Sequence, residues 1–198
     1  MPGRGKASDT DLDLIFRNAR TQRSWHPEAV AEDLLRRVYD LIKMAPTSAN
    51  CMPARFIFVI SPEGKEKLRP ALSAGNLAQT MAAPVTAIVG YDLQFYEKLP
   101  ALYREADAKA WFTGSPDLVR ETAFRNSSMQ GAYLILAARS LGLDAGPMSG
   151  FDQDKVNAAF WPDGKVKANF LCNIGYGDDG RIKPRNARLS FEEVCQIV

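Results

Sequence analysis

Two groups of arginines stand near opposite ends of the 198-residue chain. The segment Arg20-Thr21-Gln22-Arg23-Ser24 places two guanidinium groups beside hydroxyl and amide donors, and Arg185-Asn186-Ala187-Arg188 offers a second pair. A planar guanidinium can donate to two oxygens of one phosphate at the same time. Taken alone, each group is more simply interpreted as solvated surface, so phosphate binding and ordinary surface both remain open.

The single histidine, His26, restricts the chemistry that side chains could perform. A nucleophile would need His26 or a lysine as its base. Cys51, Cys172 and Cys195 are far apart and form no short-spaced ligand pair, so no metal site is expected. If the chain is an enzyme, we therefore expect a cofactor to carry the reaction and no catalytic side chain.

The composition is that of one soluble globular domain in a reducing compartment. With 46% hydrophobic and 24% charged residues, the chain is neither disordered nor fibrous. Its 25 basic and 23 acidic residues are well mixed, so nucleic acid is not an expected partner. The apolar stretches are shorter than the roughly 20 residues of a membrane span. Three scattered cysteines favour the cytoplasm over a disulfide-forming compartment.

Hydrophobic periodicity predicts the elements that must position these groups. Helices are expected over residues 11–20, 27–44, 63–72, 115–142 and 191–198. Strands are expected over residues 56–60, 85–89 and 170–174. Met129 to Ala138 is apolar nearly all round, which is typical of a protein centre or a subunit interface. The interleaved strands and helices indicate an α/β or α+β sandwich, as one domain over 11–198 after a flexible segment 1–10.

Two further segments are rich in glycine or proline. Pro46 and Pro53 bracket a segment, 45–53, that is too rich in breakers to be regular, so a loop is expected. Gly175 to Gly180 has the letters of a dinucleotide-binding fingerprint and follows a strand. Pro184 blocks an early helix behind those glycines, so the segment predicts a turn instead.

In their order along one chain, these motifs resemble the FMN-dependent nitroreductase superfamily. The residues that carry the resemblance are Arg20, the loop 45–53, Gly75-Asn76, Leu141 to Asp144, Gly146 to Asp152, and Arg185-x-x-Arg188-Leu189. The resemblance spans about residues 11–198 and is greatest to the branch that holds malonic semialdehyde reductase of the Rut pathway of pyrimidine degradation. It implies a nitroreductase-like α+β sandwich, with a central mixed sheet flanked by helices, in an intertwined homodimer.

The resemblance also implies which residues bind the cofactor. Arg20, Thr21, Gln22, Arg185 and Arg188 match positions that hold the FMN phosphate and ribityl chain. Pro46, Thr47, Ser48 and Asn50 match a loop that reaches the isoalloxazine ring from the other subunit. Asn76 matches a side chain that bonds the ring. Pro147, Met148, Ser149 and Gly150 match the segment at the reactive N5 edge, where a backbone N–H stabilises reduced flavin. Gln79 stands where many relatives place a lysine near N1 and O2, which leaves Arg23 as the nearby candidate cation.

The function implied by the resemblance is hydride transfer from NADH or NADPH through flavin N5 to a small electrophile, in a ping-pong cycle. Malonic semialdehyde, reduced to 3-hydroxypropionate, is the implied substrate. Two alternatives stay open: a broad nitroaromatic or quinone reductase, and a flavin-binding or structural dimer without turnover. The aromatic residues between Tyr91 and Phe112 either roof a substrate pocket or pack in the core.

Overall fold

A computed structural model describes residues 5–198 of the protein. Residues 1–4 of the expected flexible segment 1–10 lie outside the described residues. Helix α1 (Asp9–Leu12) begins inside the remainder of that segment, where the Ser8 and Asp11 side chains form a capping box. It continues directly into a π-helical turn, Asp13–Arg17. The first helix therefore spans residues 9–17 and ends three residues before the predicted boundary.

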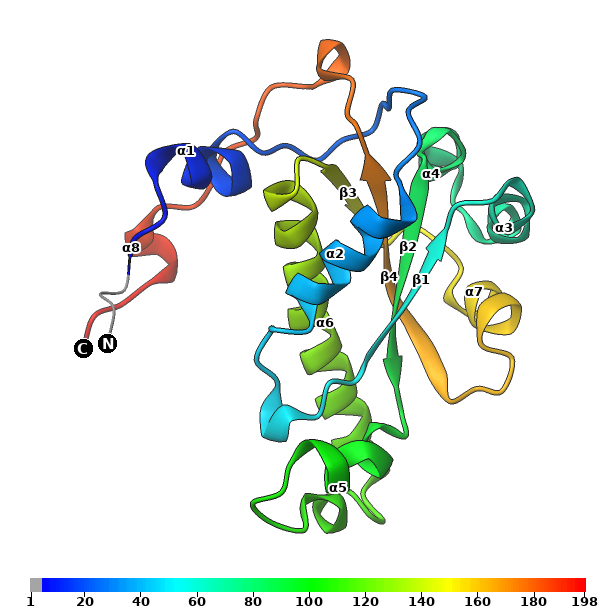
Figure 1. Cartoon of the computed structure of the whole chain (residues 1–198), viewed down its shortest axis with the longest axis vertical. Helices are drawn as coiled ribbons and strands as arrows, with labels where there is room; N and C mark the ends of the chain where they lie inside the picture. The colour runs from blue at the N-terminus through cyan, green and yellow to red at the C-terminus, as the bar shows by residue number, and fades with distance from the viewer. Residues whose placement is uncertain (1–4) are drawn as a thin grey trace.

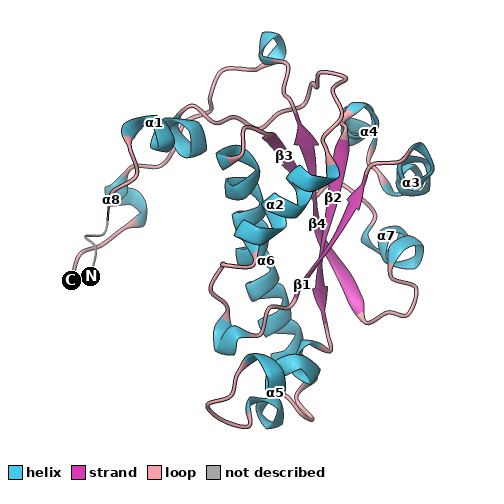
Figure 2. Ribbon diagram, viewed as in Figure 1, coloured by secondary structure: helices cyan, strands magenta, loops and turns pink. Residues whose placement is uncertain are grey.

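One four-stranded sheet forms the centre of the fold (Figure 2). Its strands are β1 (Ala54–Val59), β2 (Val85–Asp92), β3 (Asp144–Met148) and β4 (Val166–Gly175), in the order β1-β2-β4-β3. All three pairings are antiparallel, so the expected mixed sheet is wrong. Strands β2 and β3, which the long helix of the chain connects, do run in the same direction, but β4 lies between them and is antiparallel to both. The short helix α7 (Gln153–Phe160) lies in the connection from β3 to β4.

Helices cover both faces of this sheet (Figure 1). The 25-residue helix α6 (Pro116–Ser140) and α2 (Glu32–Ile42) pack on one face. On the opposite side lie α3 (Pro62–Leu68), α4 (Ala74–Ala82) and α7. The short helix α5 (Leu99–Leu102) sits near the N-terminal end of α6, and α8 (Phe191–Val194) is the last helix. The α+β class expected from the sequence is therefore confirmed.

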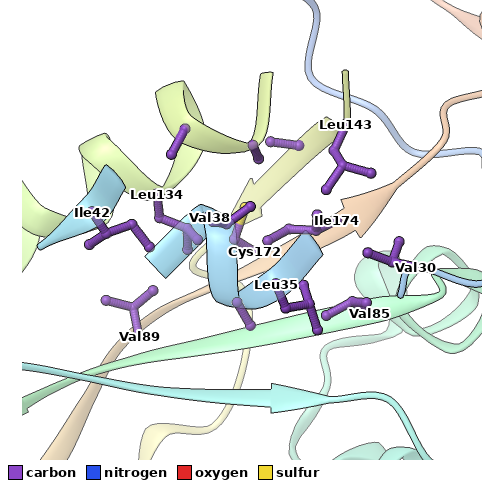
Figure 3. Packing of buried hydrophobic residues seen from close by; sticks show 14 residues of the cluster. Val30, Leu35, Val38, Ile42, Val85, Val89, Leu134, Leu143, Cys172 and Ile174 are labelled. Carbon is purple, nitrogen blue, oxygen red and sulfur yellow. The ribbon is translucent and has the colours of Figure 1, made fainter. Parts of the chain in front are cut away.

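Strand alternation divides the core into two layers. Val85, Val89, Cys172 and Ile174 point from β2 and β4 toward α2 and α6, where Leu134 meets them (Figure 3). The intervening residues Ile88 and Leu171 point the other way, toward Leu68 and Val156 of α3 and α7. This two-residue period follows from the pleat of a strand, and it lets one sheet support two apolar layers.

Most predicted elements are present with shifted boundaries. Helix α2 begins five residues later than expected, because Ala31 is extended at its N-cap (ψ 143°). Gly175 ends β4, Gly177 forms an isolated bridge with Trp25, and Asp179–Arg181 is a single 3-10 turn. The chain therefore turns here and no α-helix begins behind these glycines, as predicted. Strand β3, α4 and α7 were not predicted, and α8 ends before Cys195. No helix within residues 5–198 combines the length and apolar character that a membrane span requires.

The aromatic residues between Tyr91 and Phe112 mostly pack in the core. Phe95 is fully buried, and its ring meets that of Phe112 edge-to-face at a centroid distance of 4.9 Å. Both pack with Cys51 of the loop 45–53. Trp111 is half-exposed. The core interpretation is therefore confirmed for Phe95 and Phe112, which pack against the buried side of that loop at Cys51.

The two ends of the described chain lie together and project away from the body (Figure 1). Helices α1 and α8 form this projection. Its C-terminal part leaves apolar side chains in solvent: Leu189 is 68% exposed and Ile197 is 86% exposed. The outer side of α6 is similarly apolar at Phe124 and Met129.

Candidate functional site

A cationic pocket lies between the two chain-end segments. It encloses about 760 Å³ and is lined by residues 16–23, residues 181–188 and the last turn of α6. Seven lining side chains are cationic: Arg20, Arg23, Arg139, Arg181, Lys183, Arg185 and Arg188. Arg181 lies 3.5 Å from Asp178, and none of the other six has an ion-pair partner among residues 5–198. So many cations without an ion-pair partner make the potential of this pocket positive, which suits a bound anion.

Hydrogen bonds tie the two chain ends together around the pocket. The Arg20 guanidinium donates to the Lys183 carbonyl. The Arg185 Nη2 donates to the carbonyls of Arg17 and Ala19, at 2.7 and 2.9 Å. The sequence separations exceed 160 residues, so the fold brings together the two arginine groups that lie far apart in the sequence.

The predicted phosphate residues all reach this pocket. Arg20, Thr21, Gln22, Arg185 and Arg188 line it, as does the candidate cation Arg23. Gln22 is buried, and its Nε2 donates to Asp179 Oδ1 at 2.8 Å, so its amide holds the pocket wall. Arg188 is exposed and donates to the carbonyls of Asn186 and Ala187 in its own turn.

Strand β3 connects the pocket to a second group of predicted residues. Thr21 forms a parallel bridge with Ala145, and the Gln22 N–H donates to the Ala145 carbonyl at 3.1 Å. Gly146 permits this approach, because a Cβ there would stand 2.3 Å from the Gln22 carbonyl oxygen. Met148 follows Ala145 by three residues, or about 10 Å along the strand.

The segment after β3 packs against the N-terminal turn of α4. The Asn76 amide donates to the Gly150 carbonyl at 2.9 Å, and the Gln79 amide donates to Asn76 Oδ1 at 2.6 Å. A Cβ on Gly150 would stand 2.6 Å from the Asn76 amide nitrogen, so only glycine allows this contact. The backbone N–H groups of Ser149 and Gly150 have no acceptor among residues 5–198. Two adjacent free donors therefore lie at the loop where the resemblance places the flavin N5 edge.

A buried lysine anchors the opposite end of α4. The Lys65 ammonium donates to the Thr80 carbonyl at 2.9 Å and to the Thr86 hydroxyl at 2.6 Å. The Thr80 hydroxyl in turn contacts the Met148 sulfur at 3.4 Å. Burial lowers the pKa of Lys65 to about 8, because no carboxylate among the described residues pairs with it. This network fixes α4 and β3, the two elements that carry Asn76 and Met148.

The loop with Pro46, Thr47, Ser48 and Asn50 is held by two buried amides of α6. The Ser48 N–H donates to Asn126 Oδ1 at 2.8 Å, and the Ala54 N–H donates to Gln130 Oε1 at 3.0 Å. Between these contacts, Ala49, Asn50 and Met52 have positive φ angles of 48°, 49° and 40°. Non-glycine residues in this region are strained, so the two amides stabilise a conformation that the loop would not adopt alone.

Within one chain the loop does not reach the cationic pocket. Asn126, which holds the loop, and Arg139, which lines the pocket, are thirteen residues apart on α6. That separation corresponds to about 20 Å along the helix axis. Pro46, Ser48 and Asn50 are exposed on the surface at that distance. The structure thus brings the arginines, β3 and α4 into one region and leaves the loop in another.

Several residues of these sites were not predicted from the sequence. The sequence does distinguish Arg139, because it is the one charged residue between Met129 and Ser140. Lys65 lies in an ordinary charged helix, where nothing in the sequence distinguishes it from its exposed neighbours. Asn126 and Gln130 are four residues apart and so share one helix face, which indicates a polar contact but not its partner.

Comparison with known proteins agrees with this geometry. The model of the "Nitroreductase family" matches residues 16–176. A protein of Polynucleobacter asymbioticus is 56% identical over 191 residues, which cover 96% of this chain and 97% of that protein. A protein of Burkholderia lata is 58% identical over 190 residues, with the same shares covered. The chain belongs to the nitroreductase family. Both relatives bear the name "Putative NADH dehydrogenase/NAD(P)H nitroreductase".

Solved nitroreductase structures share the fold. One from Exiguobacterium sibiricum, described as "in complex with FMN", superposes with a TM-score of 0.85 at 20% identity, covering 98% of this chain and 99% of that one. An enone reductase of gut-bacterial fatty acid saturation superposes with a TM-score of 0.84 at 20% identity, covering 98% and 100%. Membership of the nitroreductase family supports FMN and NAD(P)H as the cofactors of this chain.

Proposed function

We propose that this nitroreductase-family chain is an FMN-dependent NAD(P)H oxidoreductase whose cofactor site is shared between two copies. The observation that carries the proposal is the pocket of seven cationic side chains at the end of β3, six of which have no counter-ion within the described part of the chain. A phosphate monoester carries nearly two negative charges at neutral pH, and paired guanidinium groups suit its oxygens. The donor set therefore fits the phosphate of FMN.

The remaining residues fit the rest of the cofactor. Thr21, Gln22 and the edge of β3 border the path from the pocket to Met148. A Cβ on Gly150 would meet the Asn76 amide and the Ser73 hydroxyl, so a glycine stands here, and its backbone has no side chain of its own to hinder a flat ring. Bound FMN supplies the hydride chemistry between NAD(P)H and the second substrate. The chain's own contribution is to hold the phosphate and to offer the free N–H groups of Ser149 and Gly150 to the ring edge.

A homodimer accounts for the loop that lies about 20 Å from the pocket. If Pro46, Ser48 and Asn50 contact the ring, they must come from a second copy. Apolar side chains that one chain leaves in solvent support such an assembly: Met44, Phe124, Met129, Leu189 and Phe191 are each at least 40% exposed. Burying them in an obligate interface is favourable, at about 25 cal/mol for each Å² of apolar surface.

The second substrate is a small electrophile that accepts hydride from the reduced flavin. The resemblance favours malonic semialdehyde, whereas the names of the two relatives, which include NAD(P)H nitroreductase, favour a nitro compound. A quinone stays open as a third acceptor. Neither the arginine pocket nor the ring-edge residues distinguish these electrophiles. The cytoplasmic location expected from the cysteine pattern likewise stays a prediction.

The proposal is tested by adding FMN to the purified protein and following flavin fluorescence, then titrating the complex anaerobically with NADH and NADPH. We expect tight FMN binding and bleaching of the flavin absorption by at least one nicotinamide. Steady-state rates on malonic semialdehyde, a nitroaromatic and a quinone then identify the acceptor. A protein that binds no flavin would refute the proposal. A flavin complex that neither nicotinamide reduces would leave a binding protein without turnover.

A further inference from the structure

Arg139 stands apart from the other cations of the pocket. It lies in the last turn of α6, whereas every other lining residue belongs to the chain-end segments 16–23 and 181–188. Helix α6 packs against the sheet through Leu134 and Ala138, so its end is fixed by the core. Arg139 therefore places a positive charge on the rigid side of a pocket whose other walls are irregular segments.

The hydrogen bonds of Arg139 are incomplete. Its Nη1 donates to the Ile15 carbonyl at 3.1 Å. Its Nε is buried and has no partner among the described residues, one of only two such side-chain atoms there. Buried polar groups in native proteins are nearly always hydrogen-bonded, and an unpaired donor is costly. A buried donor without an acceptor, on a side chain that lines this cationic pocket, indicates a missing ligand.

The charge of Arg139 is also uncompensated. No carboxylate lies within ion-pair distance of it among residues 5–198. The nearby Asp144 carboxylate accepts from the Gly177 N–H at 2.9 Å instead. Burial is the main cause that lowers the pKa of the Arg139 guanidinium, and the charge of Arg185 lowers it too, whereas the Asp144 carboxylate raises it. Arginine nevertheless remains protonated in proteins, so the pocket holds a partly desolvated cation beside a second one.

We propose that Arg139 is a cofactor-binding residue, the core-anchored ligand of the phosphate in this pocket, which makes the site select FMN over riboflavin. The inference rests on the proposed function. FMN and riboflavin share the ring and the ribityl chain and differ only in the phosphate. An anion bound at Arg139 would also hold the chain ends, because Arg20 and Arg185 line the same pocket and bind those ends to each other.

A purely structural role would give a different result. A cation in the last turn of a helix interacts favourably with the helix dipole, and the bond to Ile15 holds the first helix. Such a role would affect folding stability and would affect FMN and riboflavin binding equally. The ratio of the two dissociation constants therefore separates a phosphate ligand from a structural residue.

The experiment measures FMN and riboflavin dissociation constants by fluorescence for the parent, Arg139→Met and Arg139→Lys. Methionine keeps the apolar stem without the charge, and lysine keeps the charge without the fork. Arg125→Met is the matched control, because Arg125 is exposed on the same helix and pairs with Glu121 away from the pocket. We expect Arg139→Met to weaken FMN binding about tenfold or more, because a charge-assisted bond is removed.

In the same variant, riboflavin binding should change less than about twofold, so the preference for FMN falls by nearly the full factor. Arg139→Lys should lie between parent and Arg139→Met, and Arg125→Met should match the parent. Equal losses for both flavins, or an unchanged FMN constant in a folded variant, would overturn the assignment of Arg139. A parent protein that binds FMN no better than riboflavin would instead refute the phosphate site itself.

Discussion

The buried ammonium of Lys65 should make the free energy of unfolding rise as the pH is raised above neutrality. The buried thiols of the protein should have the opposite effect. Lys65 is 6% exposed, and its bonds go to a carbonyl and a hydroxyl, neither of which carries charge. The folded state therefore disfavours the protonated form, and the pKa falls from 10.5 to about 8. Replacing Lys65 by methionine removes this titration while keeping the length of the apolar stem.

The magnitude follows from linkage. Below about pH 8 both folded and unfolded states keep the proton, so the cost of burying the charge is fully present. Between about pH 8 and 10.5 the folded state loses the proton while the unfolded state keeps it, and stability rises with pH. The gain is about 2 kcal/mol between about pH 7 and about pH 9.5. Burial raises the pKa of Cys51 to about 11 and of Cys172 to about 12, so these thiols lower stability as pH rises above their unfolded value of 9.0.

Urea unfolding of the parent and of Lys65→Met at several pH values separates these contributions, because both proteins contain the same thiols. The free energy of unfolding of the parent minus that of the variant should increase by about 2 kcal/mol across this range. At neutral pH the difference in free energy of unfolding also contains the cost of leaving the Thr80 carbonyl without its donor. Only the change of that difference with pH reports the titration of Lys65. A difference that stays flat with pH, or that falls, would refute the description of Lys65 as a buried, uncompensated cation.

Three further perturbations test other parts of the structure. Gly146→Ala should lower the free energy of unfolding by about 1–3 kcal/mol in a thermal melt, because its Cβ would meet the Gln22 carbonyl. The control Gly75→Ala on α4, whose Cβ would meet nothing within 4 Å, should be neutral or stabilising in the same melt. Gln130→Leu leaves the Ala54 N–H unpaired and should cost about 1–3 kcal/mol by urea unfolding; no loss would contradict the clamp on the loop. His26→Gln, at an exposed position, should leave the rate of flavin reoxidation within a few-fold of the parent, whereas a loss of about 10²–10⁴-fold with FMN bound would identify His26 as the proton donor.

The sequence predicted the elements whose patterns are local. The long helix α6, the first helix and strands β1, β2 and β4 follow from apolar periodicity, and the turn at 175–180 follows from Pro184. Strand β3 was missed because Gly146 and Pro147 are poor strand formers. Pro147 is tolerated because β3 is the sheet edge, and Gly146 is required by the approach of Gln22. Antiparallel pairing was missed because it follows from the strand order, in which β4 lies between β2 and β3, and no local pattern in the sequence fixes that order.

The candidate site was predicted only in part, and for a physical reason. The two arginine groups were recognised from their residue types, but their meeting across more than 160 residues is a property of the fold. Lys65, Asn126 and Gln130 act through partners that are distant in sequence, so the sequence does not identify those partners. The assignment of Pro46 to Asn50 and of Pro147 to Gly150 to the flavin ring came from the family resemblance, and it stays a prediction.

The central claim is that one cofactor site needs the cationic pocket of one chain and the loop of another. Two variants are co-expressed with different tags and purified as mixed dimers: Arg20→Ala with Arg188→Ala disrupts the pocket, and Ser48→Trp obstructs the exposed loop. Each variant alone should lack NAD(P)H-dependent turnover. In a mixed dimer one site receives both defects and the other receives neither, so pure mixed dimers should regain about half of the parent activity. Mixed dimers as inactive as each variant alone would show that every site is built within one chain, and would contradict the account.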